Sequence, residues 1–146
     1  MIEFYFDGAC EPVNPGGHAS YGYVIYHNKK KLEAVSGYVG VGPGMSNNVA
    51  EYEALVQALV MLNGLGLSKE TILARGDSML VVNQMSGLWG SKGGLYIPYM
   101  NAAKTLAVLF SDLKFEWVPR AKNSVADALS KEALTARGVR ITVRSK

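Results

Sequence analysis

Four acidic residues stand where a strand or loop meets the next element, and they are the residues of this chain most able to do chemistry. They are Asp7 in FYFDGAC, Glu51 in SNNVAEYEAL, Asp77 in ILARGDSMLVV and Asp127 in WVPRAKNSVADAL. Carboxylates gathered in one place repel one another unless cations lie between them. Oxygen ligands suit hard divalent ions, and two such ions form a centre that cleaves phosphodiesters. The four acids therefore predict a metal-dependent nuclease, provided that the fold brings them together.

Two of these acids also have ordinary structural explanations. Asp7 precedes Gly8 in a common turn pair, and Asp77 precedes a predicted helix that it could cap. Both, however, are expected at the carboxyl ends of neighbouring parallel strands. Ligands bind at that edge of open α/β sheets, so the shared placement favours a functional role for both residues.

The other two acids have capping-box spacing, with an acid three residues after a residue that could cap a helix. Asn48 and Glu51 form one such pair, and Ser124 and Asp127 form the other. A carboxylate in the first turn of a helix that points at the sheet edge is equally well placed to hold a metal. Periodicity does not choose between Glu51 and Glu53, because apolar residues flank both.

Length and composition indicate a single globular domain over residues 1–146. Hydrophobic residues make up 49% of the chain and charged residues 18%. No apolar run reaches the roughly 18 residues of a membrane span, so no membrane association is expected. The N-terminus begins directly with a strand pattern and shows no secretion signal. The single cysteine, Cys10, is compatible with a reducing compartment, and we expect a cytoplasmic protein.

The charge of the chain is uneven. The net charge is +3, yet the segment from Arg120 to Lys146 carries seven Lys or Arg residues against two acids. That segment therefore contributes +5, and the remainder of the chain contributes −2. Cations bound at the four acids would make the surface more positive still, which suits a polyanionic partner. A basic tail that only keeps the protein soluble is the alternative.

Hydrophobic patterning predicts a mixed α/β sheet with helices on its faces. The expected strands are 2–7, 21–26, 32–39, 71–74 and 114–118, and the expected helices are 49–62, 78–85, 97–110 and 124–136. The Gly- and Pro-rich segments 8–20 and 87–94 are expected to be loops. We expect Trp117 in the core. Gly138 is a natural helix C-cap, and the segment 138–146 is either a basic tail or a short edge strand.

Four sequence blocks, in order, resemble the signature blocks of type 1 ribonuclease H, and together they cover nearly the whole chain. They are DGACEPVNPGG, SNNVAEYEAL, GDSMLVVNQM and VPRAKNSVADALS. The resemblance implies the ribonuclease H-like fold, a five-stranded mixed sheet flanked by helices. It also implies endonucleolytic hydrolysis of the RNA strand of RNA–DNA hybrids with two Mg²⁺ ions, for which Mn²⁺ can substitute. The products would carry 5′-phosphate and 3′-hydroxyl ends.

The resemblance assigns roles by position. Asp7, Glu51, Asp77 and Asp127 match the metal-binding carboxylates of the family. Asp7 would bridge both ions, Asp127 would help hold the ion that activates water, and Glu51 and Asp77 would hold the ion at the leaving oxygen. The polar residues that match substrate contacts are Asn14, Ser46, Asn47 and Asn48. Amides and hydroxyls suit that role, since hydrogen bonds to 2′-hydroxyls distinguish RNA.

The sequence also departs from bacterial members of the family. Arg120 stands in the loop where they carry a histidine, as in the archaeal-like and plant-like branch with a VPR…N…AD pattern. Arginine remains protonated and cannot act as a base, so we expect it to stabilise charge on the scissile phosphate. Met79 replaces a substrate-contacting glutamine, and only Trp89 and Lys92 remain of a basic protrusion. Hybrid affinity would then come from elsewhere, such as the basic C-terminal segment.

Alternatives to hybrid cleavage follow from the same resemblance. Recognition of duplex shape transfers between A-like duplexes, so the enzyme could also cleave double-stranded RNA. A catalytically silent hybrid-binding module is the alternative of another class, although the presence of all four acids argues against it. The protein is expected to be a monomer.

Overall fold

Three long strands form an antiparallel meander at the N-terminal end of the computed structural model, which describes residues 1–142. They are β1 (Ile2–Glu11), β2 (Gly16–His27) and β3 (Lys30–Gly42). Between β2 and β3, Asn28 and Lys29 adopt φ values of 51° and 72°, the conformation that tight hairpin turns require.

Two shorter strands complete a five-stranded mixed sheet, as the sequence predicts. β4 (Thr71–Gly76) pairs in parallel with β1, and β5 (Asp112–Trp117) pairs in parallel with β4, giving the order β3-β2-β1-β4-β5. The β1–β4 ladder ends at the pair Phe6 and Gly76. The next residue on each strand is one of the candidate acids, so parallel pairing brings these two acids side by side.

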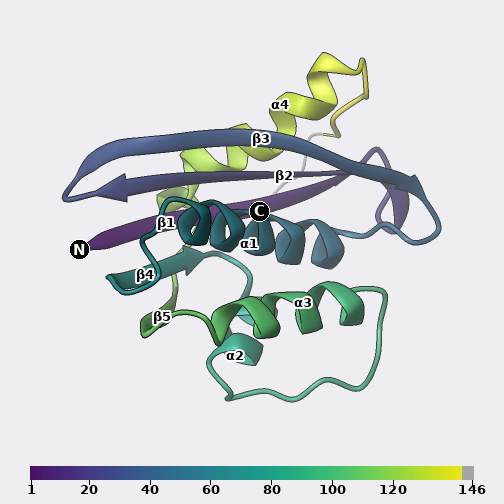
Figure 1. Cartoon of the computed structure of the whole chain (residues 1–146). Helices are drawn as coiled ribbons and strands as arrows, with labels where there is room; N and C mark the ends of the chain where they lie inside the picture. The colour runs from purple at the N-terminus through teal and green to yellow at the C-terminus, as the bar shows by residue number, and fades with distance from the viewer. Residues whose placement is uncertain (143–146) are drawn as a thin grey trace.

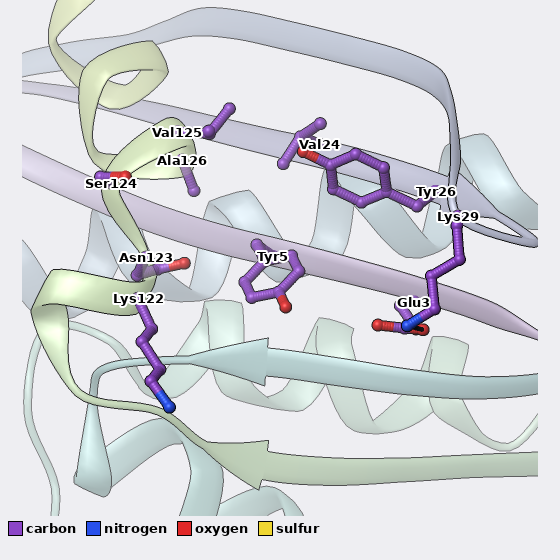
Figure 2. Close-up of a pocket in the computed structure, with 10 residues that line it drawn as sticks. All are labelled: Glu3, Tyr5, Val24, Tyr26, Lys29, Lys122, Asn123, Ser124, Val125 and Ala126. Carbon is purple, nitrogen blue, oxygen red and sulfur yellow. Dashed lines mark ion pairs between the residues drawn. The ribbon is translucent and has the colours of Figure 1, made fainter.

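Helices cover both faces of this sheet (Figure 1). The helix α1 (Asn47–Gly64) packs on β1 and β2, with α2 (Met79–Met85) and α3 (Ile97–Ala107) beside it. The helix α4 (Ser124–Ala136) packs on β1, β2 and β3. Alternate residues of β1 separate the faces: Ile2, Phe4 and Phe6 enter the core with α1. Glu3 and Tyr5 line a pocket of about 330 Å³ beside the start of α4 (Figure 2).

No helix in the described part of the chain is long and apolar enough to cross a bilayer.

Two glycines allow the helices to approach the sheet closely. A Cβ added at Gly8 would lie 2.4 Å from the carbonyl carbon of Ala50 and from the amide nitrogen of Glu51, both in α1. A Cβ added at Gly22 would lie 2.4 Å from the amide nitrogen of Ser130 in α4. Because Gly8 follows Asp7, its small size is what brings the backbone of α1 next to the first acid.

The structure corrects several predicted boundaries. The segment 8–20 is mostly strand rather than loop, because β1 and β2 continue as a ladder to Glu11 and His18 and leave only 12–15 as the turn. Asp7 therefore lies within β1 and not at its end. The third helix ends at Ala107, three residues before the predicted end, and the fifth strand begins at Asp112 rather than at residue 114. The fourth helix has the predicted bounds.

Neither pair of residues with capping-box spacing forms a capping box. Ser46 caps α1 by accepting a hydrogen bond from the backbone N–H of Val49 at 3.2 Å, so Asn48 is already inside the helix. Asn123 is the N-cap residue of α4, and Ser124 is the first residue of that helix. Neither Glu51 nor Asp127 is thereby needed to complete a cap.

The C-terminal segment and Trp117 also differ from expectation. Gly138 follows α4 with a φ of +75°, as a helix-ending glycine does. Residues 139–142 form no strand, and the remainder of the predicted edge strand lies outside the described residues. Trp117 is 42% exposed rather than in the core, because β5 is an edge strand.

Candidate active site

Three of the four acids meet at one point. Asp7 comes from β1, Asp77 follows β4, and Glu51 projects from the N-terminal part of α1. Each offers a carboxylate oxygen, and these atoms all lie within 4.8 Å of one another. The structure thus selects Glu51 over Glu53, whose carboxylate instead accepts a hydrogen bond from Gln57 at 3.3 Å.

Burial controls the protonation of this group. Asp7 is 4% exposed and Glu51 is 8% exposed. Burial, together with the charges of Asp77 and Asp127, raises the pKa of Asp7 to about 7, against the opposing effect of a hydrogen bond with Glu51. The pKa of Glu51 lies well above its usual value, first because of burial and then because of the charge of Asp7.

The pKa of Asp77 is raised less, because its surroundings partly compensate for burial. Burial is the largest cause and raises it, whereas a hydrogen bond from Asn123 and the positive charge of Arg120 lower it.

The three acids line an open cleft of about 630 Å³. Asn47 and Asn48 line it from α1, and Arg120 lines it from a short 3-10 helix (Arg120–Lys122) just before α4. Ile141 and Thr142 line it from the C-terminal segment. The hydroxyl of Thr142 donates to the carboxylate of the buried residue Glu11 at 2.7 Å, so the C-terminal segment is attached to the wall of the cleft.

Asp127 lines the same cleft but stands outside the group of three. Its carboxylate pairs with Lys131, one turn further along α4, at 3.3 Å, and with Arg120 at 3.8 Å. Its charge still contributes to the raised pKa of Asp7 and of Asp77. The fourth acid is therefore electrostatically part of the site, with two cationic side chains beside it.

The four polar residues assigned to substrate contact lie around the start of α1. The Asn14 side chain accepts a hydrogen bond from the backbone N–H of Asn47 at 2.9 Å, which ties the turn after β1 to α1. The Oδ1 atom of Asn47 is buried without a partner among residues 1–142. Ser46 uses its hydroxyl to cap α1, and Asn48 is exposed at the cleft.

Two residues that contact the acids were not predicted from the sequence. The indole N–H of Trp117 donates to the backbone carbonyl of Asp77 at 3.0 Å. The Asn123 amide donates to the Asp77 carboxylate at 3.4 Å. The position of Asn123 directly before a predicted helix is typical of a capping residue, but no pattern in the sequence connects it to Asp77.

The residues present fit a hard divalent cation. Buried carboxylates this close to one another repel when ionised, and a cation removes that repulsion. The Oε2 atom of Glu51 is buried and has no hydrogen-bond partner in the described part of the chain. An oxygen that binds a metal ion is expected to be buried and without a hydrogen-bond partner when the ion is absent, as this atom is. The donor set consists of oxygen atoms alone, as Mg²⁺ prefers.

Comparison with known proteins places the chain in a family. Residues 5–133 match the family described as "Reverse transcriptase-like". The chain is 38% identical over 133 residues to ribonuclease HI of Halobacterium salinarum, which covers 91% of this chain and 64% of that protein. It is 37% identical over 123 residues to the bifunctional protein Rv2228c of Mycobacterium tuberculosis, covering 84% of this chain and 33% of the relative. The chain thus spans about a third of the length of the mycobacterial relatives.

Solved structures agree with the sequence matches. The crystal structure of RNase H1 from Halobacterium salinarum superposes with a TM-score of 0.81 at 34% identity, covering 92% of this chain and 98% of that one. LC11-RNase H1 in complex with an RNA/DNA hybrid superposes with a TM-score of 0.84 at 34% identity, covering 94% and 99%. The chain belongs to the type 1 ribonuclease H family.

Proposed function

We propose that this protein is a metal-dependent endonuclease that hydrolyses the RNA strand of RNA–DNA hybrids. The observation that carries the proposal is the group of three carboxylates at the cleft, with oxygen atoms within 4.8 Å of one another. The similarity to a ribonuclease HI and to a ribonuclease H1 crystallised with a hybrid supports the choice of substrate.

Asp7, Glu51 and Asp77 would hold the metal, with Asp127 completing the set for a second ion. We expect Mg²⁺, with Mn²⁺ able to replace it. Two such ions stabilise the attacking and departing oxygens of an in-line displacement, which would leave 5′-phosphate and 3′-hydroxyl ends. The chain already holds the buried carboxylates of Asp7 and Glu51 next to that of Asp77, so little reorganisation of these three is needed when an ion binds.

The polar residues at the start of α1 would recognise the substrate. The amides of Asn47 and Asn48 line the cleft and can exchange hydrogen bonds with 2′-hydroxyls. Asn14 holds the turn beside them, and Ser46 could contact a DNA phosphate. Arg120 faces the acids from the other side, where its guanidinium can grip the scissile phosphate through two hydrogen bonds.

Cleavage of strand-labelled duplexes tests the proposal. One RNA strand, labelled at either end, is paired in turn with DNA and with RNA, and it is incubated with Mg²⁺. We expect internal cleavage of the RNA in the hybrid, fragments that carry 5′-phosphates, and an intact DNA strand. Equal cleavage of the RNA duplex would extend the substrate range to double-stranded RNA. Binding of the hybrid without cleavage would identify a silent binding module and contradict the proposal.

The expected setting is that of a monomer in a reducing compartment such as the cytoplasm. Cys10 is buried beside the cleft. It is the single cysteine of the sequence, so the chain cannot form an intrachain disulfide, which is compatible with a reducing compartment. Light scattering of the purified protein would measure the oligomeric state directly.

A further inference from the structure

One buried side-chain amide connects the three elements that carry Asp7, Asp77 and Asp127. Asn123 is 1% exposed and stands at the start of α4. Figure 2 shows it on the same side of β1 as Tyr5. Its amide nitrogen donates to the backbone carbonyl of Phe6 at 3.0 Å and to the Asp77 carboxylate at 3.4 Å. Phe6 immediately precedes Asp7 in β1.

The same residue also sets the position of the fourth acid. The backbone carbonyl of Asn123 accepts the helical hydrogen bond from the N–H of Asp127 at 2.9 Å. Asn123 therefore contacts β1 next to one acid, the carboxylate of a second acid after β4, and the first turn of the helix that carries a third. Few other residues could do this, because the contact needs two donor hydrogens on one atom in a space closed to water.

The orientation of the amide is determined by its surroundings. The nitrogen has two acceptors, whereas Oδ1 is buried without a partner in the described structure. Rotating the amide by half a turn would place Oδ1 against two acceptor oxygens, which is unfavourable. A buried acceptor without a partner destabilises a fold, so the contribution of Asn123 lies in the two hydrogen bonds that its nitrogen donates.

We propose that Asn123 is a positioning residue that fixes the spacing of Asp7, Asp77 and Asp127 and thereby sets the metal affinity of the site. This inference rests on the proposed function, because it takes those acids as the metal ligands. Hydrogen bonds that orient a ligating carboxylate typically change metal affinity by about 10- to 100-fold when they are removed.

Two substitutions separate positioning from mere packing. Asn123→Ala removes the amide, and Asn123→Ser keeps a residue that is favoured at helix starts but is too short to reach Asp77. We expect both to weaken Mn²⁺ binding, measured by calorimetry without substrate, by about 10- to 100-fold. Raised metal concentrations should restore part of the cleavage activity, which a purely structural defect would not allow.

Ser20→Ala is the matched control. The Ser20 hydroxyl is fully buried and donates to the backbone carbonyl of Ser130, so it also links α4 to the sheet but touches none of the acids. We expect this variant to lower the thermal midpoint while its Mn²⁺ affinity stays within twofold of the parent. Asn123 variants that behave in the same way would overturn the inference.

A measurement on the unmodified protein makes the test independent of whether the variants fold. The side-chain amide of Asn123 should give a nitrogen-15 signal that shifts on titration with Mg²⁺, with the same midpoint as a calorimetric titration of the parent protein with Mg²⁺. A signal that stays unchanged at saturating Mg²⁺ would contradict a contact with a metal-bound carboxylate. These readouts need no substrate. A parent protein that binds metal without cleaving hybrids would therefore refute the proposed function, while the effect of Asn123 on metal binding could still be measured.

Discussion

Asp7 and Glu51 lie side by side in the floor of the cleft, and burial raises the pKa of both, that of Asp7 to about 7. In an unfolded chain such carboxyls titrate near pH 4. The folded protein therefore holds these protons more tightly than the unfolded chain. The stability that the proton on Asp7 contributes is complete below about pH 4 and is lost as the pH rises through about 7.

This gives a prediction for the metal-free protein. In the presence of a chelator, the free energy of unfolding should fall between pH 5 and pH 8, and millimolar Mg²⁺ should reverse the loss at pH 8 because the ion binds only the folded state. Asp7→Asn should be more stable than the parent at pH 8 without metal, by about 1–3 kcal/mol. Urea unfolding at each pH measures this. The same dependence of the free energy of unfolding on pH in the two proteins would contradict this prediction.

Gly8 lies next to Asp7, and it offers a second test at single-residue scale. A Cβ at this position would lie 2.4 Å from backbone atoms of Ala50 and Glu51, which cannot move without displacing α1. We expect Gly8→Ala to destabilise the fold by about 1–3 kcal/mol and to weaken metal binding. Gly64→Ala, at the end of the same helix where a Cβ meets open space, should leave both nearly unchanged.

Arg120 tests electrostatic stabilisation of the scissile phosphate. It lines the cleft and lies 3.8 Å from the Asp127 carboxylate, with a charge that holds at any working pH. Arg120→Ala should lower kcat by about ten- to a thousandfold. Arg120→Lys should restore only part of this loss, since lysine keeps the positive charge but cannot form the paired hydrogen bonds of a guanidinium. Steady-state kinetics on a short hybrid measures the effect. A kcat within twofold of the parent for the alanine variant would show that Arg120 is a surface residue without a role in catalysis.

At the scale of elements, the C-terminal segment is attached to the cleft through the hydrogen bonds of Thr142 to Glu11. Truncation after Gly138 removes this attachment together with Arg140, Arg144 and Lys146. We expect weaker hybrid binding and a salt dependence that is shallower by roughly one unit for each phosphate that the segment neutralises. Filter binding over a range of salt concentrations tests this. A changed stability with an unchanged salt slope would make the segment purely structural.

The types of the elements were predictable from the sequence, but several of their limits were not. Hydrophobic patterning predicted all five strands: residues 2–7 alternate, as a half-buried strand does, and residues 71–74 form a short apolar run typical of a buried strand. The extension of β1 and β2 through a Gly- and Pro-rich segment was missed. The prolines and glycines of this segment lie in or beside the turn or where a helix approaches the sheet closely, so they do not prevent strand pairing. Cys10 and Ala19, in the same segment, pair with each other and are fully buried. Such pairing is a long-range effect that local composition does not record.

The caps of the helices show the same limit. Ser46, Asn47 and Asn48 are all good capping residues, and the choice among them depends on how the chain leaves β3. The carbonyl of Met45 accepts a hydrogen bond from the N–H of Gly16, which fixes the entry into α1 one residue later. That contact joins segments about thirty positions apart, so no local pattern could reveal it.

At the scale of the whole molecule, the convergence of Asp7 and Asp77 was predictable from the parallel pairing of their strands. The two acids directly follow the last pair of the β1–β4 ladder, although β1 itself continues past Asp7. Glu51 was predicted only through the family resemblance, since its periodicity equals that of Glu53. The buried link from Asn123 to Asp77 depends on how α4 packs against the sheet, whereas the pairing of Asp127 with Lys131 is a contact between residues four apart within α4. Side-chain contacts between elements of this kind follow from the assembled fold and not from spacing in the sequence.

The central claim is that the buried acids hold the catalytic metal, and the most direct test compares Asp7→Asn with the parent protein on one labelled RNA–DNA hybrid. The amide keeps the shape of the side chain and removes the charge that cations require. With Mg²⁺ present, we expect the parent to cleave the RNA strand and the variant to be inactive, while circular dichroism shows the same fold for both. Near-normal cleavage by the folded Asp7→Asn variant would contradict that claim.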